Sequence, residues 1–160
     1  MKIKTIKKDI NAIVGFPLTH SLSPKLHAFV YGEENIFAEM IKIASQSAEE
    51  IVTRLKAENI KVAAVTMPLK ETVIPFLDSI DVLAKKIGAV NTIVNQSGKL
   101  FGYNTDFIGV SQALSGVAVE GKKVLLLGAG GVARAVAYFL QQSFAEIIIY
   151  NRNQEKAISL

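Results

Sequence analysis

The sequence predicts an α/β fold with a mainly parallel sheet, divided into two parts. Short apolar runs bounded by turn residues alternate with segments of helical period, as expected of strand-helix-strand repeats. The 160 residues are 50% hydrophobic and 20% charged, a composition typical of a globular protein with a buried core. A polar stretch at 115–123 separates two parts with different patterns, which indicates a domain boundary.

The first part opens with a strand, a helix, a second strand and a second helix. The apolar run at 12–15 predicts a buried strand, and Pro24 with Ser23 as its cap predicts a helix through about residue 30. Residues 37–43 predict a second strand, although their apolar residues do not alternate cleanly. Residues 47–58 have the period of an amphipathic helix. Its inward face is expected to hold Ala48, Ile51, Val52 and Leu55.

A third strand is predicted at 62–65, and it stops before Pro68 because proline lacks a backbone donor and restrains the residue before it to extended geometry. Helical segments are expected at about 71–76 and 79–87. Residues 91–94 and 99–103 are expected to form a hairpin, lying as an antiparallel edge of the sheet.

A helix at about 105–114 leads into the boundary, and the second part then begins. Residues 124–127 predict a fully buried strand, 132–142 an alanine-rich helix and 147–150 another strand. We therefore divide the chain into a first domain at 1–105, a connecting helix and boundary at 106–121, and the first part of a second domain at 122–160.

Charge and hydropathy argue against several classes of function. The net charge of +4 is spread along the chain, apart from four lysines in the first eight residues that we interpret as a solvated arm, so no nucleic acid is expected to bind. No apolar run approaches the roughly 18 residues of a membrane span, and no signal-peptide core follows the basic start. A cytoplasmic protein is expected, and the absence of cysteine excludes disulfides and thiolate chemistry.

A glycine-rich turn links the predicted strand and helix of the second part. Residues 128–133 fit the G-x-G-x-x-[GA] fingerprint of dinucleotide binding, in the context that the fingerprint requires. Glycines allow a tight turn and close approach of a pyrophosphate, while the helix start offers amide donors. A plain tight turn is the alternative. The cofactor-binding residues expected here are Gly128, Ala129, Gly130, Gly131, Val132 and Ala133.

The residues about 20 positions further on bear on the choice of cofactor. NAD enzymes place a carboxylate there, whereas Asn151 and Arg152 occupy it in this sequence. The Arg152 fork suits a 2′-phosphate and Lys156 adds a second cation, which favours NADP over NAD. Alternatively, both cations cover a helix start on the surface. This part has too few strands for a six-stranded dinucleotide fold, so we expect an incomplete Rossmann domain.

Polar clusters follow the predicted strands of the first part. They lie at 21–24, at 66–70, and at Asn91 with 104–106. Ligands bind at the carboxyl ends of strands in open α/β sheets, so we expect one shared cleft. Hydroxyls, amides, one ammonium and one carboxylate suit a small polyhydroxylated acid. Taken alone, Lys70 is better explained as a solvated lysine before a helix, and Asp106 as a helix-start carboxylate, than as a catalytic pair.

Five ordered motifs run along nearly the whole chain, at 20–27 (HSLSPKLH), 65–70 (VTMPLK), 88–92 (GAVNT), 102–109 (GYNTDFIG) and 128–133 (GAGGVA). Together they resemble the shikimate dehydrogenase family, of which quinate/shikimate dehydrogenases are near relatives. The resemblance implies an amino-terminal substrate-binding α/β domain followed by a Rossmann NADP-binding domain. It also implies reversible NADPH-dependent reduction of 3-dehydroshikimate to shikimate in aromatic amino-acid biosynthesis.

The resemblance implies roles for individual residues. Lys70 and Asp106 would form the catalytic pair, because hydride transfer to a ketone develops charge on oxygen that an ammonium can stabilise and protonate. Asp106 would orient Lys70 and a substrate hydroxyl. Two serines would hold the substrate carboxylate, and a threonine and an asparagine the ring hydroxyls. These implied substrate-binding residues are Ser21, Ser23, Thr66 and Asn91.

The sequence departs from the family pattern in two ways. Ala64 and Ala28 stand where many members have asparagine, and the distal Rossmann half is absent. We therefore expect the 160-residue chain alone to be inactive, and to self-associate through exposed Rossmann strand edges. His20 and His27 do not suffice for a zinc site and are expected to pack near the cleft, so no metal is predicted.

Two other functions remain open from the sequence. One is a quinate/shikimate dehydrogenase with NAD preference, against which Arg152 argues. The other is a noncatalytic module that binds shikimate or a nucleotide.

Overall fold

A six-stranded sheet organises the first part of the molecule, in a computed structural model that describes residues 7–160. The basic arm expected at the start of the chain falls largely on residues 1–6, outside the described residues. The elements of this part are, in chain order, β1 (Asp9–Gly15), α1 (Ser23–Glu33), β2 (Ala38–Ala44), α2 (Ala48–Ala57), β3 (Val62–Val65), α3 (Leu69–Thr72), the 3-10 helix η1 (Ile74–Phe76), β4 (Ser79–Ile80), α4 (Val82–Ile87), β5 (Thr92–Gln96), β6 (Lys99–Tyr103) and α5 (Asp106–Ala113).

The strand order is β2-β1-β3-β5-β6-β4, and parallel and antiparallel pairs both occur in it. Strand β1 pairs in parallel with β2 and β3, whereas β5 pairs antiparallel with β3 and β6. Ser97 and Gly98, both at positive φ, join β5 to β6. The mainly parallel α/β fold predicted from the sequence is confirmed.

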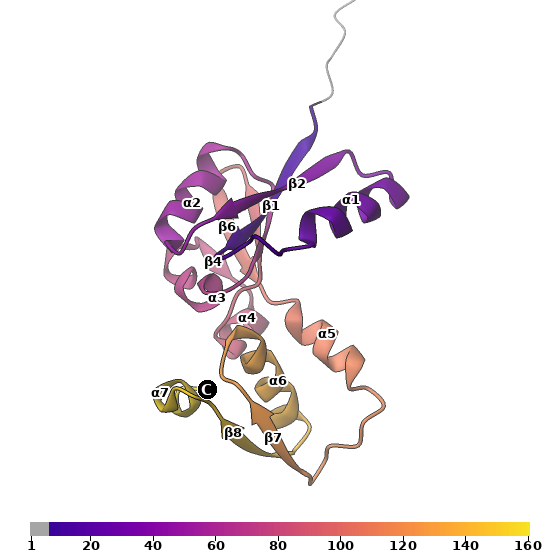
Figure 1. Cartoon of the computed structure of the whole chain (residues 1–160), viewed down its shortest axis with the longest axis vertical. Coiled ribbons are helices and arrows are strands. Elements are labelled where there is room, and N and C mark those ends of the chain that lie inside the picture. The colour runs from indigo at the N-terminus through magenta and orange to yellow at the C-terminus, as the bar shows by residue number, and fades with distance from the viewer. Residues whose placement is uncertain (1–6) are drawn as a thin grey trace, which may run out of the picture.

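The second part has its own two-stranded parallel sheet, separate from the first. Its elements are β7 (Lys123–Leu127), α6 (Gly131–Gln142), β8 (Glu146–Tyr150) and α7 (Gln154–Ile158). Figure 1 shows the two sheets at opposite ends of the molecule, with α4 and α5 between them. No helix among residues 7–160 is long and apolar enough to cross a membrane.

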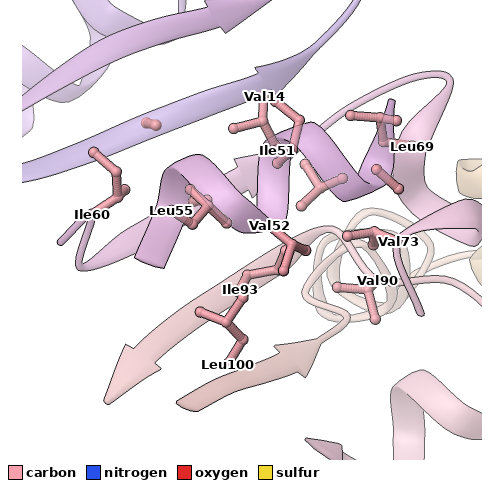
Figure 2. Packing of buried hydrophobic residues seen from close by; sticks show 14 of the residues in the cluster. Val14, Ile51, Val52, Leu55, Ile60, Leu69, Val73, Val90, Ile93 and Leu100 are labelled. Atoms are coloured by element: carbon pink, nitrogen blue, oxygen red, sulfur yellow. The ribbon is translucent and has the colours of Figure 1, made fainter. Parts of the chain in front are cut away.

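The core of the first part lies between α2 and the sheet. The predicted inward face of α2 is confirmed, since all four of its apolar residues are buried. Figure 2 shows side chains of α2 gathered with Val14 of β1 and with Ile93 and Leu100 of the hairpin. Burial of this apolar surface is the main stabilising contribution of the first part.

The start of α1 corrects one expectation. Ser23 was expected to cap the helix, but it is the first helical residue and Leu22 holds the cap position without a side-chain bond. The Ser21 hydroxyl, two residues earlier, accepts the Ser23 amide at 3.4 Å. A local hydroxyl contact therefore replaces the cap that the Ser-Pro pattern predicted.

The helix expected at 79–87 divides into two elements. Ser79 and Ile80 form β4, which pairs in parallel with β6, and Asp81 then starts α4 by accepting the Ala84 amide at 2.8 Å. The outer strand on this side is therefore β4 rather than the hairpin, which corrects the expected edge. Because the Asp81 side chain caps the helix, α4 begins at Val82 and not at residue 79, where the apolar pattern predicted its start.

Strand β7 is less buried than predicted. Its residues alternate between half-buried and exposed, and Leu125 and Leu127 are 58% and 72% exposed. Successive side chains of a strand point to opposite faces, and α6 packs against one of them. The continuous apolar run predicted a strand buried on both faces. In the described residues only one face of β7 is covered, so every second side chain is exposed.

A small apolar cluster joins the two parts. Ile87 and Ala89, at and just after the end of α4, pack against Ala135 of α6. Around them lie the half-buried side chains of Leu83, Phe107 and Tyr138. Helix α6 therefore packs against α4 and α5. This packing fixes the position of the glycine-rich turn, at the start of α6, relative to the first sheet.

The packing around β6 leads to a stability prediction. A Cβ at Gly102 would lie 2.6 Å from Leu77 Cδ1, 2.9 Å from Val90 Cγ2 and 3.0 Å from Ile80 Cγ2. We expect Gly102→Ala to lower the free energy of unfolding by about 1–3 kcal/mol in urea denaturation, because the core is already filled.

The matched control is Gly109→Ala in α5, where a Cβ would meet nothing within 4 Å. Removing a helical glycine there should stabilise the chain by about 0.5–1 kcal/mol. Equal effects of the two substitutions would show that the contacts around Gly102 are not as described.

Candidate functional site

An ion pair lies at the centre of the site. Lys70 belongs to α3, just after β3, and Asp106 is the first residue of α5, 36 residues later in the chain. The Lys70 Nζ donates to Asp106 Oδ2 at 2.6 Å, and the two side chains are 13% and 20% exposed. This much burial sets the pair apart from an ordinary solvated lysine and carboxylate.

Asn91, just before β5, holds the second oxygen of the same carboxylate. Its Nδ2 donates to Asp106 Oδ1 at 2.8 Å and to Thr105 Oγ1 at 2.9 Å, while its Oδ1 accepts the Thr105 amide at 2.9 Å. Both oxygens of Asp106 therefore have a donor, which fixes the plane of the carboxylate. Among the described residues the Lys70 ammonium donates one hydrogen bond, and it has two further N–H donors.

Backbone hydrogen bonds tie these segments to one another. The Val90 amide donates to the Lys70 carbonyl and the Val65 amide to the Asn91 carbonyl, each at 2.7 Å. Buried Asn104 donates to the Ala89 carbonyl at 2.9 Å. The cluster is therefore built on the sheet and its adjoining turns.

Thr66 and the two predicted serines lie on neighbouring loops. The Thr66 amide donates to the carbonyl of Val14 in β1 at 2.9 Å, and a Cβ at Gly15 would lie 2.6 Å from Thr66 Cγ2. The loop that leads from β1 to Ser21 and Ser23 thus starts against Thr66. Within residues 7–160, no hydrogen bond joins either serine to Lys70, Asn91 or Asp106.

The glycine-rich turn fits a pyrophosphate. Gly128 has a φ of +108°, and Gly130 precedes α6 without any side-chain cap. A Cβ at Gly130 would meet nothing within 4 Å, so the backbone is open to a close ligand. The first amides of α6, which include those of Val132 and Ala133, offer donors and positive partial charge at this opening.

The predicted 2′-phosphate residues follow β8 directly. The Gly128 amide donates to the Tyr150 carbonyl at 2.8 Å, which brings Asn151 and Arg152 beside the turn. Arg152 and Lys156 are both exposed, so their charges are accessible to an anion. Asn153 caps α7 by accepting the Lys156 amide at 3.0 Å, so a helix starts here, and both interpretations of Arg152 and Lys156 are compatible with it.

The turn and the ion pair lie next to each other, although they belong to different parts of the molecule. A Cβ at Gly131 would lie 2.7 Å from Cδ of Lys70, so the lysine stem rests on the start of α6. One helical turn further on, Arg134 Nη2 lies 2.9 Å from Glu71 Oε2. Sequence reasoning missed these contacts, because each joins residues about 60 positions apart.

The histidines do not contribute to this cluster in the described residues. His27 Nδ1 lies 2.9 Å from the Ser23 carbonyl, and its ring packs edge-on against Tyr31. No group of three metal-ligating side chains is present within residues 7–160.

The arrangement suits proton transfer at a substrate oxygen. An ammonium held by a carboxylate can donate to a developing oxyanion, and a fixed carboxylate can accept a hydroxyl proton. The adjacent turn offers free backbone amides of the kind that can bind phosphate, so an oxygen-bearing substrate and a dinucleotide bound at these two places would lie side by side.

Family models match both parts of the chain. One, described as shikimate dehydrogenase substrate binding domain, matches residues 13–93, and another, described as shikimate / quinate 5-dehydrogenase, matches residues 110–160. The shikimate dehydrogenase (NADP(+)) of Carboxydothermus hydrogenoformans is 49% identical over 155 residues, which are 94% of this chain and 55% of that protein.

Solved structures agree with this likeness. The shikimate dehydrogenase of Aquifex aeolicus has a TM-score of 0.88 at 37% identity, covering 98% of this chain and 60% of that one. The shikimate 5-dehydrogenase of Thermus thermophilus, in complex with NADP(H) and shikimate, has a TM-score of 0.79 at 35% identity, covering 94% and 59%. The chain spans just over half the length of the curated relative described above.

Proposed function

Because this chain belongs to the shikimate dehydrogenase family, we propose that the complete protein reversibly reduces 3-dehydroshikimate to shikimate with NADPH. The observation that carries the proposal is the Lys70–Asp106 ion pair, held half-buried beside a turn suited to pyrophosphate. The name of the Carboxydothermus relative and the ligands of the Thermus structure support NADP and shikimate.

Lys70 acts on the reacting oxygen in this proposal. When bound, the nicotinamide supplies or accepts the hydride. In the reductive direction the Lys70 ammonium donates a hydrogen bond to the carbonyl oxygen and transfers a proton to it as the alcohol forms. In the oxidative direction the neutral amine takes that proton back. Asp106 keeps the ammonium directed at the oxygen and accepts a hydrogen bond from a neighbouring hydroxyl.

The other polar residues of the site are assigned to the substrate and to the phosphates of NADP. We assign Ser21 and Ser23 to the substrate carboxylate, and Thr66 and Asn91 to ring hydroxyls. The position of Asn91 against Asp106 supports its place beside the reacting centre. The amides that open α6 would receive the pyrophosphate, and Asn151, Arg152 and Lys156 the 2′-phosphate of NADP.

We likewise propose that the chain divides into a substrate domain at 1–105, a connecting segment at 106–121 and a Rossmann portion at 122–160. We also propose a cytoplasmic location. The two separate sheets support the division. We also propose that residues 1–160 alone are inactive, since they span 55% of the Carboxydothermus relative.

Lys70→Ala in the complete protein tests the assignment of the proton donor. We expect turnover to fall by about 100-fold or more, with a much smaller rise in the Michaelis constant for shikimate, because general acid catalysis contributes that much. Steady-state kinetics in both directions would measure it, with exposed Lys99→Ala as the control. Unchanged turnover in the Lys70 variant would remove this residue from the chemistry.

Arg152→Ala tests the choice of cofactor. Loss of a charge-assisted hydrogen bond should raise the Michaelis constant for NADPH about 10-fold or more and leave that for NADH nearly unchanged. Arg54→Ala, which removes an exposed ion pair with Glu58 on α2, is the control. An equal effect on both cofactors would count against a contact with the 2′-phosphate and favour the NAD-preferring alternative.

A further proposal concerns self-association through the second sheet. Apolar side chains on β7 and β8 are largely exposed, among them Leu125, Leu127, Ile148 and Tyr150. Both strands also have an outer edge that no other described strand pairs with. We propose that copies of the 160-residue chain associate here.

Light scattering over a range of chain concentrations tests this. The mass should rise above that of a monomer, and Leu127→Lys should reduce the association by placing a charge on the exposed face. Val117→Lys, at an exposed apolar residue outside the sheet, is the control. A monomeric mass at every concentration would contradict the proposal.

A further inference from the structure

We infer that Gly131 is a positioning residue for Lys70, so that the phosphate-binding turn also sets the place of the proton donor. This inference rests on the proposed function and deepens it. The G-x-G-x-x-[GA] fingerprint assigns roles to Gly128, Gly130 and Ala133 and leaves position 131 open. Phosphate binding alone therefore does not explain a glycine there.

The lysine stem occupies the space that a side chain at position 131 would need. A Cβ on Gly131 would lie 3.0 Å from Cβ, 3.3 Å from Cγ and 2.7 Å from Cδ of Lys70. The φ of Gly131 is not positive, so backbone conformation does not require glycine either. By contrast, a Cβ at the neighbouring Gly130 would meet nothing within 4 Å.

Rotation of the lysine side chain cannot relieve all of these contacts. Cγ and Cδ can move by a change of rotamer, but Cβ of Lys70 is fixed by the backbone of α3. Either the stem leaves its place or the start of α6 moves away from α3. In the first case the ammonium loses the 2.6 Å contact with Asp106 Oδ2 that directs it.

Separation of the two helices is opposed by a second contact. Arg134 of α6 pairs with Glu71, the residue after Lys70, at 2.9 Å, and the arginine side chain is 17% exposed. The Arg134 Nε is buried without a hydrogen-bond partner within residues 7–160, so the guanidinium is held by its Nη atoms. The apolar contact of Ala135 with Ile87 and Ala89 adds to this attachment.

The first experiment is Gly131→Ala in the complete protein. We expect turnover to fall by about 100-fold, because a misplacement of about 1 Å at a catalytic group has an effect of that size. The dissociation constant for NADPH, measured by fluorescence titration, should change less than about threefold, since the backbone amides of the turn remain. Gly32→Ala in α1, where a Cβ meets nothing within 4 Å, is the matched control and should leave both quantities unchanged.

A double-mutant cycle on thermal unfolding tests the contact without any activity. Gly131→Ala should lower the melting temperature by roughly 3–6 °C when Lys70 is present. In a Lys70→Ala background the loss should be clearly smaller, because Cγ and Cδ, the latter the atom closest to the new Cβ, are gone and only the 3.0 Å contact with Cβ remains. This measurement also decides the matter if the Gly131 variant is too unstable for kinetics.

The outcomes separate this inference from the proposed function. Equal losses of melting temperature in the two backgrounds would overturn it, as would a drop in NADPH affinity as large as the drop in turnover. If the unsubstituted protein fails to oxidise shikimate, the proposed function is wrong, while the cycle still decides whether Gly131 positions Lys70.

Discussion

The ion pair between Lys70 and Asp106 is the contact on which the site depends. Its partners follow β3 and β6, and β5 lies between these strands in the sheet. Asn91, just before β5, completes the arrangement by donating to the carboxylate oxygen that the lysine does not use. The sheet order therefore fixes the orientation of the pair, and a sheet with another order would separate these groups.

The second constraint is the attachment of α6 to the first part. Helices α4 and α5 carry apolar residues that receive α6, and the Glu71–Arg134 pair adds a polar link close to the site. As a result the start of α6, which is suited to phosphate, lies against the stem of Lys70. The proposed binding sites for substrate and cofactor are therefore adjacent, and they meet where α3 contacts the start of α6.

Local sequence patterns predicted much of the fold. The elements that were predicted wrongly depend on contacts between residues far apart in the sequence. The period of α2 and the limits of β3 follow from their own residues, and both were predicted. The pairing of Ile80 with β6 depends on a distant glycine, Gly102, whose missing side chain leaves room for the side chain of Ile80. The motifs identified the residue types of the site. No local signal indicated that Asn91 holds Asp106 or that Gly131 faces Lys70, since these pairs form only after the chain folds.

The central claim is that Lys70 contacts the reacting oxygen of the substrate, while Asp106 directs the ammonium and contacts a neighbouring hydroxyl. A crystal structure of the complete protein with shikimate and NADP bound tests it most directly. We expect the Lys70 Nζ and an Asp106 oxygen to lie within about 3.2 Å of shikimate hydroxyls beside the nicotinamide ring. A bound shikimate that contacts neither side chain, with the ion pair intact and turned away from it, would contradict the account.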